Sequence, residues 1–439
     1  MYLVYSLLFS LGVILTAPYY LWRLRGRINS ARWRERFGFL PESFQQAVPG
    51  AIWVHAVSVG ETLAVVGLVR ELRKTFPDRK ILLSHVTPAG REAGENRLPD
   101  VAGRFYLPLD WAWCVRRALA RIRPALLVVV ETELWPNLLR SAQKLGSRVV
   151  LVNARLSDRS VSRYRFMRPF MRRVLENVDR VCAQTNTDAE RFRLLGAKPE
   201  RVVVTGNLKF DALPPQLGEF PARLAKAFER AQRRPVVVAA STMPGEESLL
   251  LEAWDEVWRR YPQALLILAP RHPARFEAVA QLLAEAGRSI VRRTALESTE
   301  EALATQLSSP ELLLLDSIGE LAGVFELADV VFMGGTLVPT GGHNLLEPAY
   351  WGKPILFGPH MRNFRDIAQL FLDAGAAVQV RNARELGRVI LQLLEDEARR
   401  CELGERAKKV LEQESGATQR VMERLRELLG AQVPVRARA

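Results

Sequence analysis

A glycine-rich segment between two apolar runs carries the side chains best suited to binding a phosphorylated sugar. Residues 333–359 read MGGTLVPTGGHNLLEPAYWGKPILFGP. The glycine pairs let a ligand approach the backbone, and a helix expected to open at residues 342–344 would point free N–H groups at an anion. Asn344 and Glu347 would lie on its first turn, where they can bond to sugar hydroxyls. The plainer interpretation is an ordinary strand–turn–helix corner.

Charged side chains also follow apolar runs in the first half of the chain. Glu61 follows one run, Glu131 and Glu133 follow a second, and Lys209 follows the last run before a proline-rich stretch. Two carboxylates after so apolar a run are costly to bury unless they are bonded or used. Lys209 can meet a phosphate, a carboxylate or Glu131. Glu61 taken alone is explained as a first-turn carboxylate stabilised by the helix dipole.

Two loops in the second half have groups that could contact a nucleotide. Arg271 follows the run 264–268 and offers a rigid fork for a phosphate or a carboxylate. Residues 318–320 follow the run 312–316, and backbone groups near their glycine can reach a base or a ribose. Neither loop is specific alone.

Several common nucleotide motifs are missing from the sequence. It contains no GxGxxG fingerprint and no P-loop lysine motif, so a dinucleotide or P-loop enzyme is not indicated. No two aspartates lie two positions apart, so the usual metal clamp for a sugar nucleotide is missing as well. A transferase of this kind would have to neutralise its leaving group with Arg271, Lys209 and helix dipoles.

The elements that must position these residues alternate along the whole chain. Apolar, β-rich runs are separated by stretches with helical spacing, which predicts doubly wound parallel sheets. The expected strands are 51–59, 80–87, 104–109, 125–130, 148–153, 180–185 and 201–205, then 236–240, 264–268, 289–292, 312–316, 330–333, 355–357 and 377–380. The fold class is therefore α/β, with two Rossmann-like domains whose strand ends face a cleft.

Breaks in this alternation give the expected domain boundaries. A polar, proline-rich stretch at 212–219 predicts a hinge between a first domain at 23–211 and a second at 220–430. The charged helical part from residue 395 is expected to pack back towards the first domain. Residues 431–439 would form a tail.

Composition limits the possible partners. The 439 residues are 48% hydrophobic and 25% charged, as in globular proteins, and the net charge of +14 suggests a polyanionic partner or a negatively charged membrane surface. Three cysteines without a CxxC motif and five histidines indicate neither a disulfide framework nor a zinc site.

The N-terminus predicts a membrane anchor at residues 1–22. Residues 2–22 carry no charge, and their length is close to the ~20 apolar residues that span a bilayer. Arginines follow this run and none precedes it, which favours a retained anchor with the remainder of the chain on the cytoplasmic side. The alternative is a buried N-terminal helix of a soluble domain.

Six motifs, in this order, resemble the 3-deoxy-D-manno-octulosonate (Kdo) transferases of lipopolysaccharide biosynthesis: HAVSVGE, ETELWPN, NARLS, GNLKFD, PRHP and GGTLVPTGGHNLLEP. The resemblance covers essentially the whole chain. It implies the GT-B fold and an inverting transfer of Kdo to the 6′-hydroxyl of a tetraacylated lipid A precursor, lipid IV-A. The donor CMP-Kdo is a co-substrate, and neither a cofactor nor a metal is implied. The reaction would take place on the cytoplasmic face of the inner membrane.

The same resemblance assigns roles to individual residues. The glutamate matching Glu61 is the general base, and the residues matching Glu131 and Lys209 support the transition state. An N-terminal domain would take the lipid acceptor, and a C-terminal domain the donor. CMP contacts are expected at Pro270, Arg271, Ile318, Gly319, Glu320, Asn344, Leu345, Leu346 and Glu347.

Two rival functions remain open from the residues. One is a nucleotide-sugar transferase of the cell-wall lipid type, against which the ETELWPN and GNLKFD motifs argue. The other is an inactive GT-B protein that binds an acidic lipid, which would be indicated by loss of Glu61 or of the PRH and GGHN residues. All of these are present. No nucleic-acid-binding module is recognised, and no oligomeric state is indicated.

A basic stretch that begins at Arg155 in the NARLS motif and continues to Arg173 is the candidate acceptor surface. Arg165, Arg168 and Arg172 interleave with apolar residues at helical spacing, which predicts one amphipathic helix. Its apolar side could enter the acyl boundary while the guanidinium groups bind lipid phosphates. The alternative is a core helix with a solvated basic face.

Overall fold

The computed structural model describes residues 1–23, 30–41, 44, 50–211, 218–297 and 299–430. The chain divides into two compact units, one made of residues 1–212 with 414–439 and the other of residues 213–413. Most of the expected hinge, residues 212–217, and the whole tail, 431–439, lie outside the described residues. The same is true of the first basic residues after the N-terminal helix. Each unit is described by itself.

The first unit contains a seven-stranded parallel sheet with the order β3-β2-β1-β4-β5-β6-β7. Residues Ile52, Ile81 and Leu126 lie in register across its centre. Its strands are β1 (Ile52–His55), β2 (Ile81–His85), β3 (Gly103–Tyr106), β4 (Leu126–Val130), β5 (Arg148–Ala154), β6 (Arg180–Ala183) and β7 (Val202–Val204). Each lies in, or within one residue of, a range expected from the apolar runs.

Both faces of this sheet are buried. Trp53 and Leu127 belong to one core cluster and Ile52 and Val128 to another, because successive side chains of a strand point to opposite faces. The helices are α1 (Tyr2–Arg23), α2 (Ser30–Arg36), α3 (Val59–Ala64), α4 (Val66–Thr75), α5 (Pro88–Arg97), α6 (Ala112–Ile122), α7 (Pro136–Lys144), α8 (Asp158–Phe166), α9 (Arg168–Leu175), α10 (Asn186–Leu194) and α20 (Ala417–Gly430).

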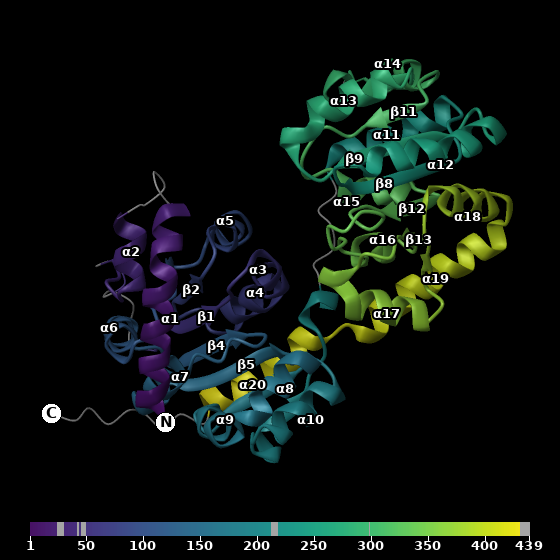
Figure 1. Cartoon of the computed structure of the whole chain (residues 1–439). Coiled ribbons are helices and arrows are strands. Elements are labelled where there is room, and N and C mark those ends of the chain that lie inside the picture. The colour runs from purple at the N-terminus through teal and green to yellow at the C-terminus, as the bar shows by residue number, and fades with distance from the viewer. Residues whose placement is uncertain (24–29, 42–43, 45–49, 212–217, 298, 431–439) are drawn as a thin grey trace. The chain divides into compact units, whose positions relative to one another are not determined.

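The last helix of the chain, α20, belongs to the first unit. Val421, Met422 and Leu425 lie in the same core cluster as α4. The Asp211 carboxylate accepts a 2.6 Å hydrogen bond from the Gly416 N–H and another from the Thr418 N–H. The start of α20 is thereby fixed to the segment that follows β7 (Figure 1).

Helix α1 packs with one side against the first unit. The Tyr5 hydroxyl donates to Asp110 at 2.9 Å, and the indole N–H of Trp111 donates to Ser10 at 2.8 Å. The opposite side is exposed, with Leu3 at 81%, Leu7 at 71% and Leu15 at 70%. Within the described part of the chain, no helix is long and apolar enough to cross a membrane.

The second unit contains another seven-stranded parallel sheet, with the order β10-β11-β9-β8-β12-β13-β14. Gly334 follows β12 and passes so close to β8 that a Cβ there would lie 2.7 Å from the Ser241 carbonyl oxygen. Its strands are β8 (Val236–Thr242), β9 (Leu265–Pro270), β10 (Ile290–Arg292), β11 (Leu312–Leu314), β12 (Val330–Met333), β13 (Ile355–Phe357) and β14 (Val378–Gln379).

Helices also cover this second sheet. Those packed on the principal core cluster include α12 and α18, through Trp254 and Leu386. The helices are α11 (Glu219–Arg230), α12 (Glu246–Arg260), α13 (Phe276–Glu285), α14 (Glu300–Leu307), α15 (Leu321–Val324), α16 (Leu346–Tyr350), α17 (Arg365–Asp373), α18 (Ala383–Glu395) and α19 (Glu397–Glu414).

The basic stretch is two short helices, α8 and α9, and the expectation of one amphipathic helix was wrong. Pro169 lies at the start of α9, and the chain turns at Met167. A proline restrains the residue before it and cannot donate the next helical hydrogen bond, which explains the break. Phe170 and Met171 are core residues, whereas Phe166 is 94% exposed.

Candidate functional site

Glu61 lies in the first turn of α3, directly after β1. The Ser58 hydroxyl caps this helix by accepting the Glu61 N–H, and it donates to Glu61 Oε1 at 2.9 Å. The other carboxylate oxygen accepts the Val57 N–H at 2.8 Å. Two carboxylate oxygens offer about four acceptor positions, so both keep capacity for a further bond. The residue is therefore a cap and a possible proton acceptor at once.

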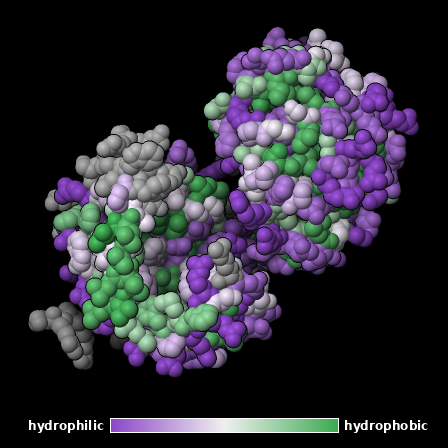
Figure 2. Space-filling model, viewed as in Figure 1, coloured by the Kyte–Doolittle hydropathy of each residue, from purple (hydrophilic) through white to green (hydrophobic). Residues whose placement is uncertain are grey.

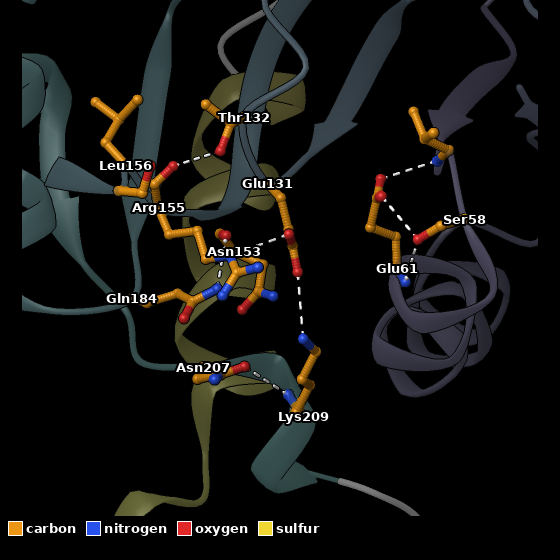
Figure 3. Close-up of polar contacts among 12 residues, drawn as sticks. Ser58, Glu61, Glu131, Thr132, Asn153, Arg155, Leu156, Gln184, Asn207 and Lys209 are labelled. Carbon is orange, nitrogen blue, oxygen red and sulfur yellow. Dashed lines mark hydrogen bonds and ion pairs between the residues drawn. The ribbon is translucent and has the colours of Figure 1, made fainter. Parts of the chain in front are cut away.

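Glu131 follows β4, the strand that pairs with β1. Its φ of +57° lies in the left-handed region, which costs a side-chain-bearing residue on the order of 1–3 kcal/mol. Lys209 Nζ lies 3.3 Å from Oε1, and Arg155 Nε lies 3.1 Å from Oε2 (Figure 3). The carboxylate is thus held between two cations.

Lys209 is delivered by a short 3-10 turn, η3 (Leu208–Asp211), after β7. The Asn207 side chain accepts the Lys209 N–H at 3.0 Å, and the Asn153 side chain accepts the Leu208 N–H at 2.9 Å. Asn153 is fully buried at the end of β5 and has φ of +53°. Asparagine side chains therefore accept the backbone N–H groups of both Leu208 and Lys209, at the start of η3.

The charges of Glu131 and Lys209 affect the pKa of Glu61. Burial raises the pKa of the Glu61 carboxyl, and the hydrogen bonds from Val57 and Ser58 oppose this rise. The charge of Glu131 raises the same pKa further, whereas the charge of Lys209 lowers it. The structure therefore brings Glu61, Glu131 and Lys209 close together in the first unit, from loops after β1, β4 and β7.

Glu133 belongs to the same group of carboxylates. Burial, with the charges of Glu61 and Glu131 added to it, raises the pKa of Glu133 to about 7. The sequence placed Glu133 in this loop but gave it no role, as it gave none to Asn153 and only a place in the basic stretch to Arg155. Asn153 and Arg155 lie in the NARLS motif where a strand ends, and that position was the available signal.

In the second unit, a buried carboxylate organises the glycine-rich loop. Glu246 is 0% exposed at the start of α12 and accepts four backbone N–H groups. Oε2 accepts those of Gly335 at 2.6 Å and Met243 at 3.1 Å, and Oε1 accepts those of Thr336 and Leu337 at 2.9 Å. Glu246 was not predicted as a site residue, although the acidic pair of Glu246 and Glu247 follows β8 after a short turn.

Arg271 and the glycine-rich loop lie near each other. Pro270 ends β9, and the Arg271 N–H donates to the Thr242 carbonyl at 3.1 Å. The Arg271 side chain is exposed. Burial lowers the pKa of His343 to about 4, and the charges of Arg271 and His272 add to this effect. His343 is therefore neutral near pH 7, in the field of the Arg271 guanidinium group.

The loop at Ile318, Gly319 and Glu320 is built around the glutamate. The Arg293 guanidinium group donates two hydrogen bonds, of 2.8 and 2.7 Å, to the Glu320 carboxylate. The Ser317 hydroxyl donates to the same carboxylate. Ile318 is 78% exposed, and Gly319 has φ of +91°. The Glu320 carboxylate is thus largely engaged, so the accessible groups of this loop are Ile318 and the backbone.

The helix expected at residues 342–344 begins later than predicted. Helix α16 starts at Leu346 and has five residues. Asn344 precedes it, and its side chain accepts the Leu346 N–H at 3.2 Å and lies 3.5 Å from Glu347. Leu345 and Leu346 are buried, so only their backbone groups can meet a ligand. Glycines at 341 and 342 with positive φ hold the chain in a turn instead of a helix.

The predicted acceptor arginines lie together in sequence on α8 and α9. Arg165 and Arg168 are exposed on either side of Phe166 and Met167. Arg172 is also exposed and lies 3.8 Å from Glu176, one turn further along α9. They form a cationic surface around two exposed apolar side chains.

Known proteins share both the sequence and the fold. The family described as 3-deoxy-D-manno-octulosonic-acid transferase (kdotransferase) matches residues 31–212. A 3-deoxy-D-manno-octulosonic acid transferase from Haemophilus influenzae is 34% identical over 92% of this chain and 93% of its own length. One from Bordetella pertussis is 36% identical over 94% of this chain and 96% of its own.

Two solved structures are similar in fold at low sequence identity. A UDP-GlcNAc 2-epimerase from Neisseria meningitidis covers 86% of this chain with a TM-score of 0.58 and 14% identity. An Anabaena protein solved with UDP and glucose covers 86% with a TM-score of 0.52 and 15% identity. They support the expected GT-B class, two parallel-sheet α/β domains. The two transferases from Haemophilus influenzae and Bordetella pertussis, by their identity over most of the chain, show that the chain belongs to the 3-deoxy-D-manno-octulosonic acid transferases and is a glycosyltransferase.

Proposed function

We propose that this protein transfers Kdo from CMP-Kdo to the 6′-hydroxyl of a tetraacylated lipid A precursor during lipopolysaccharide synthesis. The observation that carries the proposal is the grouping of Glu61, Glu131 and Lys209 after β1, β4 and β7 in a chain of this family. Glu61 takes the proton of the acceptor hydroxyl as the hydroxyl oxygen attacks the anomeric carbon of Kdo, with inversion, and the bond from that carbon to the phosphate oxygen breaks and releases CMP. Lys209 and Glu131 support the charged transition state. No metal takes part.

The donor is bound in this proposal by the second unit. The exposed Arg271 fork bonds the CMP phosphate, the loop at 318–320 meets the nucleoside, and Glu347 accepts bonds from ribose hydroxyls. Support comes from the exposure of the Arg271 and Glu347 side chains and from the charge of Arg271 near the neutral His343. The identity of the sugar as Kdo follows the activity for which the two relatives are named.

A membrane-facing surface is the third part of the proposal. The apolar stripe along the outer side of α1 is visible in Figure 2, and its most exposed side chains include Leu3, Leu7 and Leu15. Tyr5 and Ser10 bond the inner side to the unit. We propose that α1 lies in the lipid surface of the inner membrane on its cytoplasmic side, with Arg165, Arg168 and Arg172 binding acceptor phosphates.

Transfer itself is tested with the full-length protein, CMP-Kdo and tetraacyl lipid A precursor. Mass spectrometry of the lipid should show the added mass of Kdo, and the number of additions counts the sugars transferred. Glu61→Gln protein serves as the control and should leave the lipid unchanged. An unmodified lipid with the wild-type protein would refute the proposed function.

Membrane attachment is tested by flotation with vesicles containing anionic lipids. Leu7→Glu with Leu15→Glu should release the protein from vesicles, because the exposed face of α1 loses its apolar surface. The matched control is Leu145→Glu with Leu194→Glu, two side chains of the same unit that are each 58% exposed. Equal binding of both variants would show that α1 does not hold the protein on the membrane.

A further inference from the structure

A cavity of about 320 Å³ lies in the second unit beside the glycine-rich loop. Its lining includes Pro339, Gly341, His360, Arg362, Arg365 and Gln369. None of the residues expected to contact CMP is among them, although Gly341 lies only three positions before Asn344. The cavity is therefore lined by residues other than the expected CMP contacts, and one of them, Gly341, belongs to the same segment of the chain as Asn344.

The cavity carries positive charge without a matching carboxylate. Several other arginines of this unit, such as Arg275 and Arg293, form ion pairs with glutamates. Across the described residues, Arg362 and Arg365 have no such partner, and both line the cavity. The first turn of the nine-residue helix α17 begins at Arg365 and adds its free N–H groups on the same side.

The wall of the cavity is rigid. The His360 N–H donates to the Thr336 carbonyl at 3.0 Å, and the Asn363 N–H donates to the Gly341 carbonyl at 2.9 Å. Gly341 has φ of +105°, and a Cβ there would lie 2.5 Å from the Asn363 side chain. Thr336 is itself fixed by Glu246. Arg362 thus lies on a loop that is already bonded in place, and Arg365 lies at the start of α17, which lowers the cost of ordering them around a ligand.

The volume of the cavity indicates whether it can hold a whole nucleotide sugar or only a part of one. Small-molecule sites measure about 300–1,000 Å³, so this cavity is at the lower end of the range. It suits one monosaccharide with a carboxylate better than a sugar joined to a nucleotide. Arginine forks match a carboxylate, and the Gln369 amide can bond to hydroxyls.

We propose that this cavity binds the sugar part of the donor, with Arg362 and Arg365 at the C1 carboxylate of the octulosonic acid. It would make the enzyme select an acidic sugar, while the loops at 270–271, 318–320 and 344–347 hold the nucleotide. This inference rests on the proposed function, because the donor is taken to be CMP-Kdo.

The test compares the donor with its nucleotide fragment. Arg362→Gln with Arg365→Gln should raise the KM for CMP-Kdo roughly 10- to 100-fold, the effect of losing about one charge-assisted hydrogen bond. The Ki of CMP as a product inhibitor should stay unchanged. The control is Arg384→Gln, an exposed arginine of the same unit that is not in the cavity lining. Arg362→Lys with Arg365→Lys should restore part of the affinity.

A binding measurement separates this inference from the proposed function. Calorimetry with CMP-Kdo and with its methyl ester should show an ester penalty for the wild type and none for the Arg362→Gln, Arg365→Gln variant. An equal penalty in both, or a parallel loss of CMP affinity, would overturn the assignment of the cavity. A wild-type protein that transfers no Kdo would refute the proposed function, and the ester comparison would still decide the cavity.

Discussion

The two units use a carboxylate in opposite ways at the same place in the sheet. In the first, β1 and β4 are neighbours, and the loops after them carry Glu61 and Glu131. In the second, β8 and β12 are neighbours, and Glu246 follows β8. Both places are the point where strand order reverses, which in open α/β sheets is where ligands bind.

The difference lies in what each carboxylate bonds. Glu61 is 8% exposed, takes its hydrogen bonds from its own helix start, and has an acceptor position to spare. Glu246 is 0% exposed and holds four N–H groups, three of them from the glycine-rich loop. A carboxylate left partly accessible can do chemistry, whereas one whose oxygens are filled by backbone groups fixes the shape of a binding loop.

The largest effect expected from this comparison is the loss of turnover in Glu61→Gln. A general base contributes about 10²–10⁴-fold to the rate, and glutamine cannot accept the proton. The rate of CMP release measures the loss, and calorimetry should show unchanged CMP binding. Glu71→Gln is the control, because Glu71 is in the same unit and its side chain is 43% exposed. A Glu61→Gln protein with near wild-type turnover would make Glu61 only a helix cap.

Glu246→Gln should act on binding and stability instead. Glutamine replaces one acceptor oxygen with an NH₂ group, so buried N–H groups lose their partner, at about 1–3 kcal/mol of unfolding free energy. The glycine-rich loop should also move and CMP affinity fall. Urea unfolding and calorimetry measure the two effects, with Glu252→Gln on the same helix as the control. Unchanged CMP affinity despite the lost stability would mean that the loop does not shape the nucleotide site.

A smaller effect is expected at the acceptor surface of the first unit. Arg165→Glu, Arg168→Glu and Arg172→Glu together should raise the KM for the lipid acceptor about tenfold, because phosphate-binding guanidinium groups become carboxylates. CMP affinity should not change. The control replaces Arg70, Arg116 and Lys144, exposed basic residues of the same unit, with glutamate. Equal acceptor kinetics in both triple variants would leave the stretch as a solvated basic face.

The smallest expected effect is a shift of the pH profile. Glu61 must be deprotonated to act, so kcat/KM should rise with pH through its raised pKa, above the ordinary value of 4.5. Lys209→Met removes a charge that lowers this pKa, and Glu131→Gln removes one that raises it. The acid limb should therefore move to higher pH in the first variant and to lower pH in the second. Movement in the same direction would contradict the proposed grouping.

The strands of both sheets could be predicted from the sequence because an apolar run is a local feature of the chain. Each strand of both sheets lies in, or close to, an apolar run, since strands covered on both faces must be apolar throughout. Glu61, Glu131, Lys209 and Arg271 were placed after strands because each of them follows such an apolar run. The single helix over 165–175 was wrong because helical spacing was weighed without Pro169, which ends one helix and starts the next.

By itself, the sequence determined two parallel-sheet α/β units, the loops that carry Glu61, Glu131, Lys209 and Arg271, and the family. Only the tertiary structure decided which strands are neighbours, and therefore that Glu131 lies close enough to Glu61 to raise its pKa while Glu246 is buried under the glycine-rich loop. The same holds for Asn153, whose buried amide fixes the lysine segment 55 positions later in the chain. Local pattern reports which face of an element is buried, but bonds between distant segments depend on how the elements pack.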